Sequence, residues 1–325
     1  MVSSTPAAAV VVTSHNRPLR LRWLLNALAE QTLPAERLEV LVAHDSTAPE
    51  TEELLRTHPL TAQGRLRHIT FAPGSVMPGA KRNAAWRAAR APLVLFTDDD
   101  CRPSADWVQR ALEAAAAHPG AIVQGMTVPD PQEAVVLRGA PRAHTVFVKP
   151  PTAWAETCNI AYPRELLERV NGFDPDLRVG EDTDLFMRAQ ATGAELVAVP
   201  AMLVYHAVVA HSLPTALRSL GRWQHMALLV KRHPALREDI FGRVFWKPEH
   251  AALTVAVAAA LVRRSPLAAL LALPWVALSV RDRTYGRGLR GLVRSASELP
   301  GHAAVDATEI VTLARGSVRY RTLLL

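Results

Sequence analysis

Three consecutive carboxylates, Asp98, Asp99 and Asp100, follow an apolar run in the stretch LVLFTDDDCRP (residues 93–103). Like charges on neighbouring residues repel one another, and the next few positions do not offer a full set of counter-charges. An Asp-x-Asp at the end of a strand suits a hard divalent cation, Mg²⁺ or Mn²⁺, which prefers oxygen ligands and keeps positions open for phosphate. A solvated loop, or caps for a helix that begins near Ser104, would also explain the triplet. The triplet alone leaves both interpretations open.

The elements that would position these carboxylates are strands and helices that alternate over the first 125 residues. This alternation predicts an α/β fold with a mostly parallel sheet that is covered by helices on both faces. Ligands bind such sheets at the carboxyl ends of the strands, where the strand order reverses. The triplet, Asp45 and the pair His15 and Asn16 each follow an expected strand, which predicts one shared site. The expected strands cover residues 8–14, 38–45, 66–72, 91–97 and 121–126, and the expected helices cover 18–31, 48–58, 79–90 and 104–118.

Five motifs occur in a fixed order along the chain: VVVTSHNRP, LVAHDSTAPE, PGAKRNAAW, LVLFTDDD and GFDPDLRVGEDTDL. Together they resemble glycosyltransferase family 2, whose members are inverting enzymes of the GT-A fold that use nucleotide-diphosphate sugars. The resemblance covers about residues 8–211. It implies a Rossmann-like GT-A domain over residues 1–211, which binds the nucleotide sugar and carries the catalytic residues, and a helical C-terminal extension over residues 212–325.

The resemblance also implies which residues bind the donor nucleotide. Asp45 would contact the base or ribose, and a turn residue before Ser46 and Thr47 is the alternative that we favour less. Arg82 would contact the base or a phosphate, or Lys81 would do so, because the register is uncertain by one residue. The family often has an acid where this chain has His44, which leaves the nucleotide preference open. The implied donor-binding residues are Ser14, Asn16, Arg17, Asp45, Lys81, Arg82, Asn83, Asp98 and Asp99.

The cofactor implied by the resemblance is Mg²⁺ or Mn²⁺. Asp100 would bind the metal through the diphosphate, and Asp98 is a second implied metal ligand. His206, in LVYHAV, lies where some members of the family supply a third ligand. A lone histidine after a strand is more often structural, and His211 is a weaker competitor for the same role.

The general base and the acceptor side are implied in the same way. In GEDTDL, Asp182 would take the proton from the acceptor hydroxyl, with Glu181 as the near alternative. Acids at a helix start are also favoured by the helix dipole, and the two roles do not exclude each other. On the acceptor and sugar side we expect Trp154 to stack on a sugar ring, Asn159 to bind the donor sugar or phosphate, and Asp174 to face the sugar.

The C-terminal third is basic and contains two apolar runs. Residues 214–325 hold 17 Lys and Arg against 7 Asp and Glu, whereas residues 1–213 hold 20 against 23. The runs at 251–262 and 265–280 are each shorter than the roughly 20 residues that a spanning helix needs. They predict either a buried helical hairpin or an interfacial hairpin whose arginines meet an anionic membrane surface. Nucleic acid is not expected, because few aromatic residues interleave the basic ones.

The expected location follows from the cysteines and the N-terminus. Cys101 and Cys158 are too few for a disulfide framework, and no signal peptide is recognised. These features favour a cytoplasmic protein, and the basic cluster beside the apolar runs favours a peripheral position on the inner face of the cell membrane. AELVAVPAMLVYHAV further along predicts two short strands around Pro200.

The function implied by the resemblance is transfer of a sugar from a nucleotide-diphosphate sugar to a hydroxyl of a cell-envelope, polysaccharide or lipid-linked glycan. Two alternatives stay open. A sugar-phosphate nucleotidyltransferase also uses an acidic metal site, but its expected Gly-rich N-terminal signature is absent. A non-catalytic nucleotide-sugar-binding protein at the membrane would need the nucleotide-sugar site but not the catalytic general base.

Overall fold

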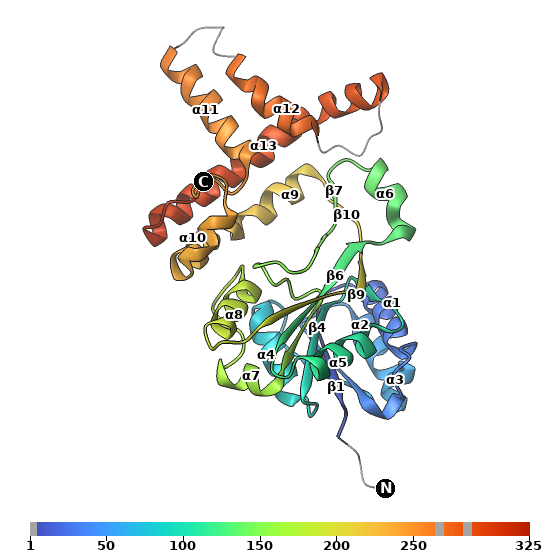
Figure 1. Ribbon diagram of the computed structural model, residues 1–325. Coiled ribbons are helices and arrows are strands. Elements are labelled where there is room, and N and C mark those ends of the chain that lie inside the picture. Colours follow the sequence, from blue (N-terminus) through green and yellow to red (C-terminus); the bar gives the residue numbers. More distant parts are fainter. Residues whose placement is uncertain (1–4, 264–269, 282–287) are drawn as a thin grey trace. The chain divides into compact units, whose positions relative to one another are not determined.

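The computed structural model describes residues 5–263, 270–281 and 288–325 (Figure 1). The chain forms two compact units, one from Met1–Glu133 with Thr145–Val208 and one from Ala134–His144 with Val209–Leu325. The second unit therefore takes a short segment from the middle of the chain as well as the C-terminal third. A division into separate domains after residue 211 stays a prediction.

The first unit is built on one eight-stranded sheet with the strand order β3-β2-β1-β4-β8-β6-β9-β5. Strands β3, β2, β1 and β4 pair in parallel, and so do β6 and β9, whereas β8 and β5 are antiparallel to their neighbours. The predicted mostly parallel α/β sheet is confirmed. The strands are β1 (Ala8–Ser14), β2 (Leu38–His44), β3 (Leu66–Thr70), β4 (Leu93–Asp98), β5 (Cys101–Pro103), β6 (Ile122–Pro129), β8 (Ile160–Pro163) and β9 (Leu196–His206).

Helices cover both faces of this sheet, because its central strands are apolar on both sides (Figure 1). In β1, Ala8, Val10 and Val12 belong to one core cluster, while Ala9 and Val11 belong to the other. This is the period of two that a strand imposes on its side chains. The helices are α1 (Pro18–Ala29), α2 (Pro49–Thr57), α3 (Pro59–Ala62), α4 (Pro78–Ala88), α5 (Trp107–Ala117), α7 (Arg164–Arg169) and α8 (Glu181–Gln190), with 3₁₀ turns η1 (Ala35–Arg37) and η2 (Pro131–Glu133).

The two short strands expected around Pro200 are instead one strand, β9. Its pairing with β6 shifts register between Gly125 and Met126, which pair with Val199 and Leu203. The skipped residues include Pro200, which has no N–H to donate to a ladder. A Cβ on Gly125 would overlap the Met202 carbonyl oxygen, so only glycine lets β6 pass this irregularity.

The strand order reverses at β1, which lies between β2 and β4. From β1 the chain first adds β2 and β3 on one side and then returns to place β4 on the other. The carboxyl ends of these strands coincide, because Ser14 pairs with His44 and Thr13 pairs with Asp98. A crevice at such a reversal is where ligands bind sheets of this class.

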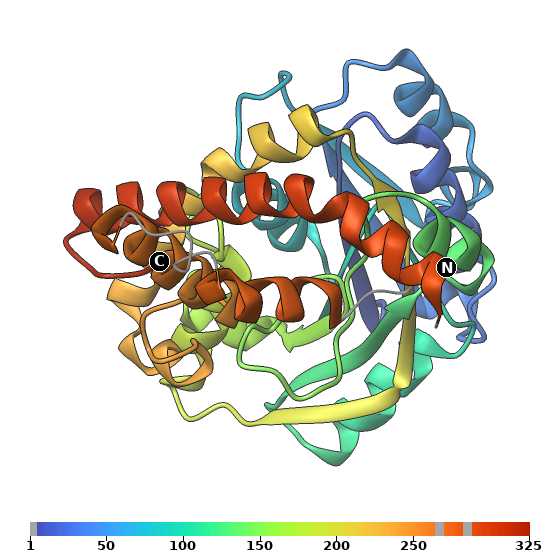
Figure 2. The same cartoon turned by 90° about the horizontal axis from the view of Figure 1, so that it is seen from above.

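The second unit is mostly helical, and its longest helix, α13 (Leu289–Tyr320), has 32 residues (Figure 2). Helix α13 packs against the 3₁₀ helix η3 (Leu220–His225), where a Cβ on Gly316 would overlap the Gln224 carbonyl oxygen. Within the residues that the structure describes, every helix is too short or too polar to cross a bilayer. The other elements are α6 (Ala134–Gly139), β7 (Ala143–His144), β10 (Val209–Ala210), α9 (Leu213–Ser219), η3 (Leu220–His225), α10 (Met226–Arg232), η4 (Pro234–Asp239), α11 (Pro248–Arg263) and α12 (Leu273–Arg281).

Candidate active site

The middle carboxylate of the triplet, Asp99, is buried against the end of β1. Its Oδ2 accepts hydrogen bonds from Ser14 Oγ at 2.8 Å and from the backbone N–H of His15 at 3.3 Å, and its Oδ1 lies 3.2 Å from Arg17 Nη1. Burial, together with the charge of Asp100, raises the pKa of Asp99 to about 6. Asp99 therefore joins the turn after β1 to the triplet.

Asp100 faces two groups, one cationic and one able to bind a metal. Its Oδ2 accepts from Arg17 Nη1 at 2.5 Å, and its Oδ1 lies 3.5 Å from His206 Nε2. His206 Nδ1 lies 2.8 Å from the Ala207 carbonyl oxygen, which can only accept, so Nδ1 is assigned a proton and Nε2 is the ring nitrogen that faces Asp100. β5 and β9 bring the two residues together, because Cys101 pairs with His206.

Potential metal-ligand atoms of Asp100, Cys101 and His206 lie within 4.8 Å of one another. Burial raises the pKa of the Cys101 thiol well above its ordinary value, so Cys101 stays protonated and is a poor ligand for a hard cation. The side chains of this group that suit Mg²⁺ or Mn²⁺ as ligands are therefore Asp100 and His206.

Asp98 is connected to the distant acidic stretch through one buried arginine on α4. Arg82 donates from Nη2 to Asp98 Oδ1 at 2.9 Å and from Nη1 to Glu181 Oε1 at 2.8 Å. Burial opposes the charge of Arg82, but Asp98 and Glu181 outweigh it and raise the pKa of the guanidinium. The fork of Arg82 thus holds the triplet and the start of α8 beside each other.

Asp182 differs from its neighbour Glu181 in its partners. Its Oδ1 accepts from the backbone N–H of Thr183 at 2.9 Å, and in the described part of the chain it forms no ion pair. Burial, and then the charge of Glu181, raise the pKa of Asp182 to about 7. A carboxylate with a pKa near neutrality can both accept and release a proton at physiological pH.

Asp45, which is expected to bind the donor nucleotide, follows β2 and is surrounded by polar groups. Its Oδ1 accepts from Lys81 Nζ at 2.6 Å and lies 3.0 Å from His15 Nδ1, while its Oδ2 accepts from the Gly74 N–H at 3.1 Å. Burial favours the neutral form, but the hydrogen bonds from Lys81 and His15 outweigh it and lower the pKa of Asp45. Lys81 and Arg82 therefore face different acids, Asp45 and Asp98.

Two asparagines hold loops around the site. Asn16, in the left-handed region with φ 54°, accepts at Oδ1 from the backbone N–H groups of Thr47 and Ala48 at 2.7 and 3.3 Å. Asn83 donates to the Phe173 carbonyl at 2.7 Å and accepts from the Phe173 N–H at 2.9 Å. Both side chains therefore hold the backbone of a neighbouring loop in place.

His44 lies immediately before Asp45 but belongs to different surroundings. Its ring is buried, which lowers its pKa, and its Nε2 lies 3.2 Å from Glu52 Oε1. His44 therefore does not replace the acid that the family often has at this position.

Of the expected acceptor-side residues, Asn159 requires a correction. Its side chain is 1% exposed; Nδ2 donates to the Met126 and Met202 carbonyls at 2.8 Å each, and Oδ1 accepts from Trp107 Nε1 at 2.8 Å. All its hydrogen-bonding groups serve the core around β6, β8 and β9, so it has none to offer a sugar. Its type and its motif gave no sign of this, because the partners are 33 to 52 residues away.

Trp154 and Asp174 lie nearer the acids of α8. The Trp154 carbonyl accepts from Thr183 Oγ1 at 2.8 Å, which ties its loop to the first turn of the helix. Asp174 accepts from the Asp176 N–H at 2.9 Å, and its carbonyl would lie 3.1 Å from a Cβ on Gly79 at the start of α4. Their contact with a sugar stays a prediction.

Two residues of the site carried no sequence signal. The Gly74 N–H reaches Asp45, and Thr145 Oγ1 donates to the carbonyl of His206 at 3.1 Å. Neither Gly74 nor Thr145 belongs to any of the five motifs that carry the family resemblance. Only the fold brings either of them to the site.

Comparison with known families agrees with this geometry. The glycosyl transferase family 2 model matches residues 9–170, and the glycosyl transferase family group 2 model matches residues 93–282, which is more than half of the chain. The match therefore spans the sheet, the triplet and the acids of α8.

Two curated relatives are a glucosyltransferase and a succinoglycan biosynthesis protein by name. The chain is 26% identical over 276 residues to validoxylamine A glucosyltransferase of Streptomyces hygroscopicus subsp. jinggangensis, which covers 74% of this chain and 64% of the relative. It is 28% identical over 224 residues to the succinoglycan biosynthesis protein ExoO of Rhizobium meliloti, which covers 63% of this chain and 62% of that protein. The chain thus spans somewhat less than two thirds of either relative.

Solved structures share the fold. The mannosyltransferase PcManGT from Pyrobaculum calidifontis, in complex with GDP-Man and Mn²⁺, superposes with a TM-score of 0.59 at 21% identity over 98% of this chain and 88% of that one. S. aureus TarS 1–349 in complex with UDP-GlcNAc superposes with a TM-score of 0.52 at 17% identity over 97% and 92%. The fold of the first unit is GT-A, and with the family models these findings show that the chain belongs to glycosyl transferase family 2.

Proposed function

We propose that this protein transfers a sugar from a nucleotide-diphosphate sugar to an acceptor hydroxyl, with inversion at the anomeric carbon and with Mg²⁺ or Mn²⁺. One observation carries the proposal: Arg82 bonds both Asp98 of the triplet and Glu181 at the start of α8. A metal-and-diphosphate site and a carboxylate base beside each other are what a single displacement needs.

The donor nucleotide would lie at the reversal of strand order. Asp45 would accept from the base or the ribose, with Ser14, Asn16 and Asn83 holding the surrounding loops. Lys81 and Arg17 supply the positive charge, and a fork-shaped guanidinium suits a phosphate. We propose that Arg17 turns from Asp100 to the diphosphate when the donor binds.

Asp100 and His206 would hold the divalent cation, with Asp98 and Asp99 beside them. The orientation of His206 supports this role, because its protonated Nδ1 faces a carbonyl and its Nε2 faces Asp100. A metal held here would neutralise charge on the leaving diphosphate. The mannosyltransferase PcManGT, described with GDP-Man and Mn²⁺, supports the same cofactor class for this chain.

Asp182 would act as the general base. The acceptor oxygen bonds to the anomeric carbon while the bond from that carbon to the diphosphate oxygen breaks, and the hydroxyl proton passes to Asp182. Glu181 is less suited, because Arg82 already engages it at 2.8 Å. Trp154 and Asp174 would border the acceptor, a hydroxyl of a cell-envelope, polysaccharide or lipid-linked glycan.

Calorimetry tests the donor site directly. UDP, GDP, CDP and dTDP are titrated with and without Mn²⁺ into wild-type protein, Asp100→Ala and the exposed-acid control Glu113→Gln. We expect one diphosphate to bind wild type and the control in a Mn²⁺-dependent way, and Asp100→Ala to lose that dependence. Absence of binding by every diphosphate would refute the donor site, and binding without transfer from the matching sugar nucleotide to any acceptor would favour a non-catalytic binding protein.

We also propose that the second unit meets an anionic membrane surface at the cytoplasmic side. Several large apolar side chains of its helices are exposed, among them Leu261 and Val262 at 72% and 82%. Leu292 and Val293 of α13 are also exposed, next to Arg290 and Arg294 in sequence. Apolar side chains that enter the headgroup region beside arginines are typical of interfacial helices.

A further inference from the structure

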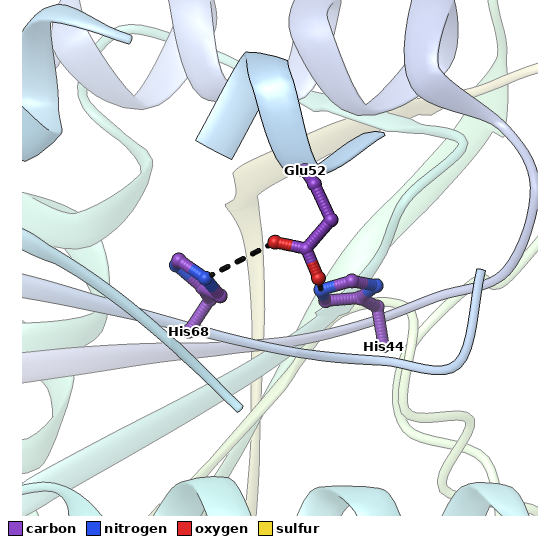
Figure 3. A group of neighbouring side chains, drawn as sticks. All are labelled: His44, Glu52 and His68. Atoms are coloured by element: carbon purple, nitrogen blue, oxygen red, sulfur yellow. Dashed lines mark ion pairs between the residues drawn. The ribbon is translucent and has the colours of Figure 1, made fainter. Parts of the chain in front are cut away.

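Two histidines and a glutamate lie together under α2, apart from the acidic triplet (Figure 3). His44 ends β2 and His68 lies in β3, where their partners across the strands are Thr70 and Val42. Side chains alternate along a strand, so both imidazoles project from the same face of the sheet. Glu52 reaches down from α2 between them.

Both rings direct the same kind of atom at the carboxylate. His44 Nε2 lies 3.2 Å from Glu52 Oε1, and His68 Nε2 lies 3.4 Å from Glu52 Oε2. The ring centroids are 5.9 Å apart, and one potential ligand atom from each of the three residues lies within 4.8 Å of the others.

We propose that His44, Glu52 and His68 form a binding site for Zn²⁺ or a similar late divalent metal. Zn–N and Zn–O distances are about 2.0–2.1 Å, so the edge of a tetrahedron of ligands is about 3.3 Å. The two nitrogen–oxygen distances already match that edge. Only the separation of the two nitrogens has to close, and His68 is partly exposed, so its ring has room to turn.

The metal takes the place of a proton between imidazole and carboxylate. His44 Nδ1 is buried and has no hydrogen-bond partner among the described residues, so no protein group at Nδ1 opposes its carrying the proton. Nε2 is then the coordinating atom. Glu52 is partly exposed, which leaves an approach for the ion and a position for water.

A second cluster of potential ligands, with one histidine and two acids, has its charge compensated by a lysine. His250, Asp306 and Glu309 also lie within 4.8 Å of one another, but Lys247 Nζ is 2.7 Å from Asp306 and 2.6 Å from Glu309. A lysine supplies the positive charge there. In the described ranges Glu52, by contrast, has only the two histidines as ion-pair partners.

The ligand types also separate this site from the triplet. Two imidazoles and one carboxylate suit zinc, whereas the carboxylates of the triplet suit a hard cation. A bound metal would tie α2 to β2 and β3 one residue before Asp45. This inference stands independently of the transferase activity.

The test measures bound metal rather than activity. Full-length wild type, Glu52→Gln, His68→Ala, Asp100→Ala and the exposed control His118→Ala are equilibrated with Zn²⁺ in excess Mg²⁺, and bound zinc is quantified. We expect one zinc per chain for wild type, His118→Ala and Asp100→Ala, and at least a tenfold loss of affinity for Glu52→Gln and His68→Ala. Co²⁺ in place of zinc should give the intense visible absorption of a four-coordinate ion, and the same two substitutions should remove it.

The results that overturn the proposal are equally specific. Either no retained zinc in wild type, or zinc retained equally by Glu52→Gln and His68→Ala, would exclude the site. Zinc lost only with Asp100→Ala would assign the metal to the triplet instead. Circular dichroism of the variants separates loss of a ligand from loss of fold.

Discussion

At the scale of single residues, the three acids of the triplet are distinguished by their partners rather than by their type. Asp98 is bound by Arg82, Asp99 by Ser14, and Asp100 by Arg17. Each acid therefore has a distant counter-charge or donor in place of the local one that the sequence lacks. The same holds at α8, where Arg82 engages Glu181 and leaves Asp182 without an ion pair in the described structure.

Substitution of Asp182 by Asn should remove the base while it keeps the volume. We expect the rate of transfer to fall about 10²–10⁴-fold with donor binding nearly unchanged. Single-turnover kinetics and calorimetry of the same preparation measure the two effects. An Asp182→Asn variant with wild-type turnover would remove this residue from the mechanism, whereas Glu113→Gln should match wild type in both measurements.

The raised pKa of Asp182 also predicts a pH dependence of both rate and stability. The base form is lost as pH falls through about 7, so the rate of transfer should fall on the acid side of that value. Because burial raises the folded pKa above the ordinary value of 3.8, the folded state binds this proton more tightly than the unfolded state. Stability is therefore lost as pH rises from about 4 to about 7, and the loss is complete above pH 7. Asp182→Asn should therefore unfold at a higher temperature than wild type at pH 8, with the difference vanishing near pH 4. Thermal melts across that range check the sign, and a destabilised variant at pH 8 would contradict it.

At the scale of elements, α4 is the piece that joins the halves of the site. Its residues Lys81, Arg82 and Asn83 are buried and polar, and they reach β2, β4 and the loop before α8 in turn. This loop can approach α4 because Gly172 has φ 65°, and a Cβ there would overlap Asn83 Oδ1.

Gly172→Ala should thus destabilise the fold more than an alanine substitution at a glycine where only the backbone is strained. We expect the left-handed conformation to lower the free energy of unfolding by about 1–2 kcal/mol, and the displacement of Asn83 to lower it by about 1–3 kcal/mol more. Gly120→Ala is the matched control, because Gly120 has φ 83° and nothing within 4 Å of its added Cβ. Denaturant unfolding compares the two, and equal losses would mean that the contact with Asn83 is readily relieved.

At the scale of the whole molecule, the charges divide along the chain. Residues 214–325 carry 17 basic and 7 acidic side chains, whereas the chain before them is slightly acidic. Part of the acids of the first part, namely Asp45, the triplet, Glu181 and Asp182, lies at the candidate site. The bases of the second part accompany exposed apolar side chains, which is the combination that anionic lipid attracts.

This division predicts binding to anionic vesicles. Wild-type protein should float with vesicles that contain phosphatidylglycerol, and binding should weaken with salt and be low on pure phosphatidylcholine. The double variant Leu261→Ser/Val262→Ser should bind several-fold less, whereas Leu19→Ser, at an exposed apolar residue of the first unit, serves as the control. Equal flotation of all proteins on both lipids would argue against the proposed surface.

Much of the first unit was open to prediction because its signals are local. Apolar runs such as 8–14 and 38–45 indicate buried parallel strands, and the polar residues that end them must meet at one edge of the sheet. The order of the five motifs was sufficient for the family and the GT-A fold. These features depend on residues close together in the chain, so the sequence by itself determined them.

The tertiary structure decided what depends on long-range pairing. It pairs Lys81 with Asp45 and Arg82 with Asp98. The sequence could not tell which of these two neighbouring residues faces which acid. It placed Asn159 in the core, and it brought His44, Glu52 and His68 together from two strands and a helix. Side chains of the same type differ in role according to which distant groups the sheet sets beside them, and no local pattern encodes that.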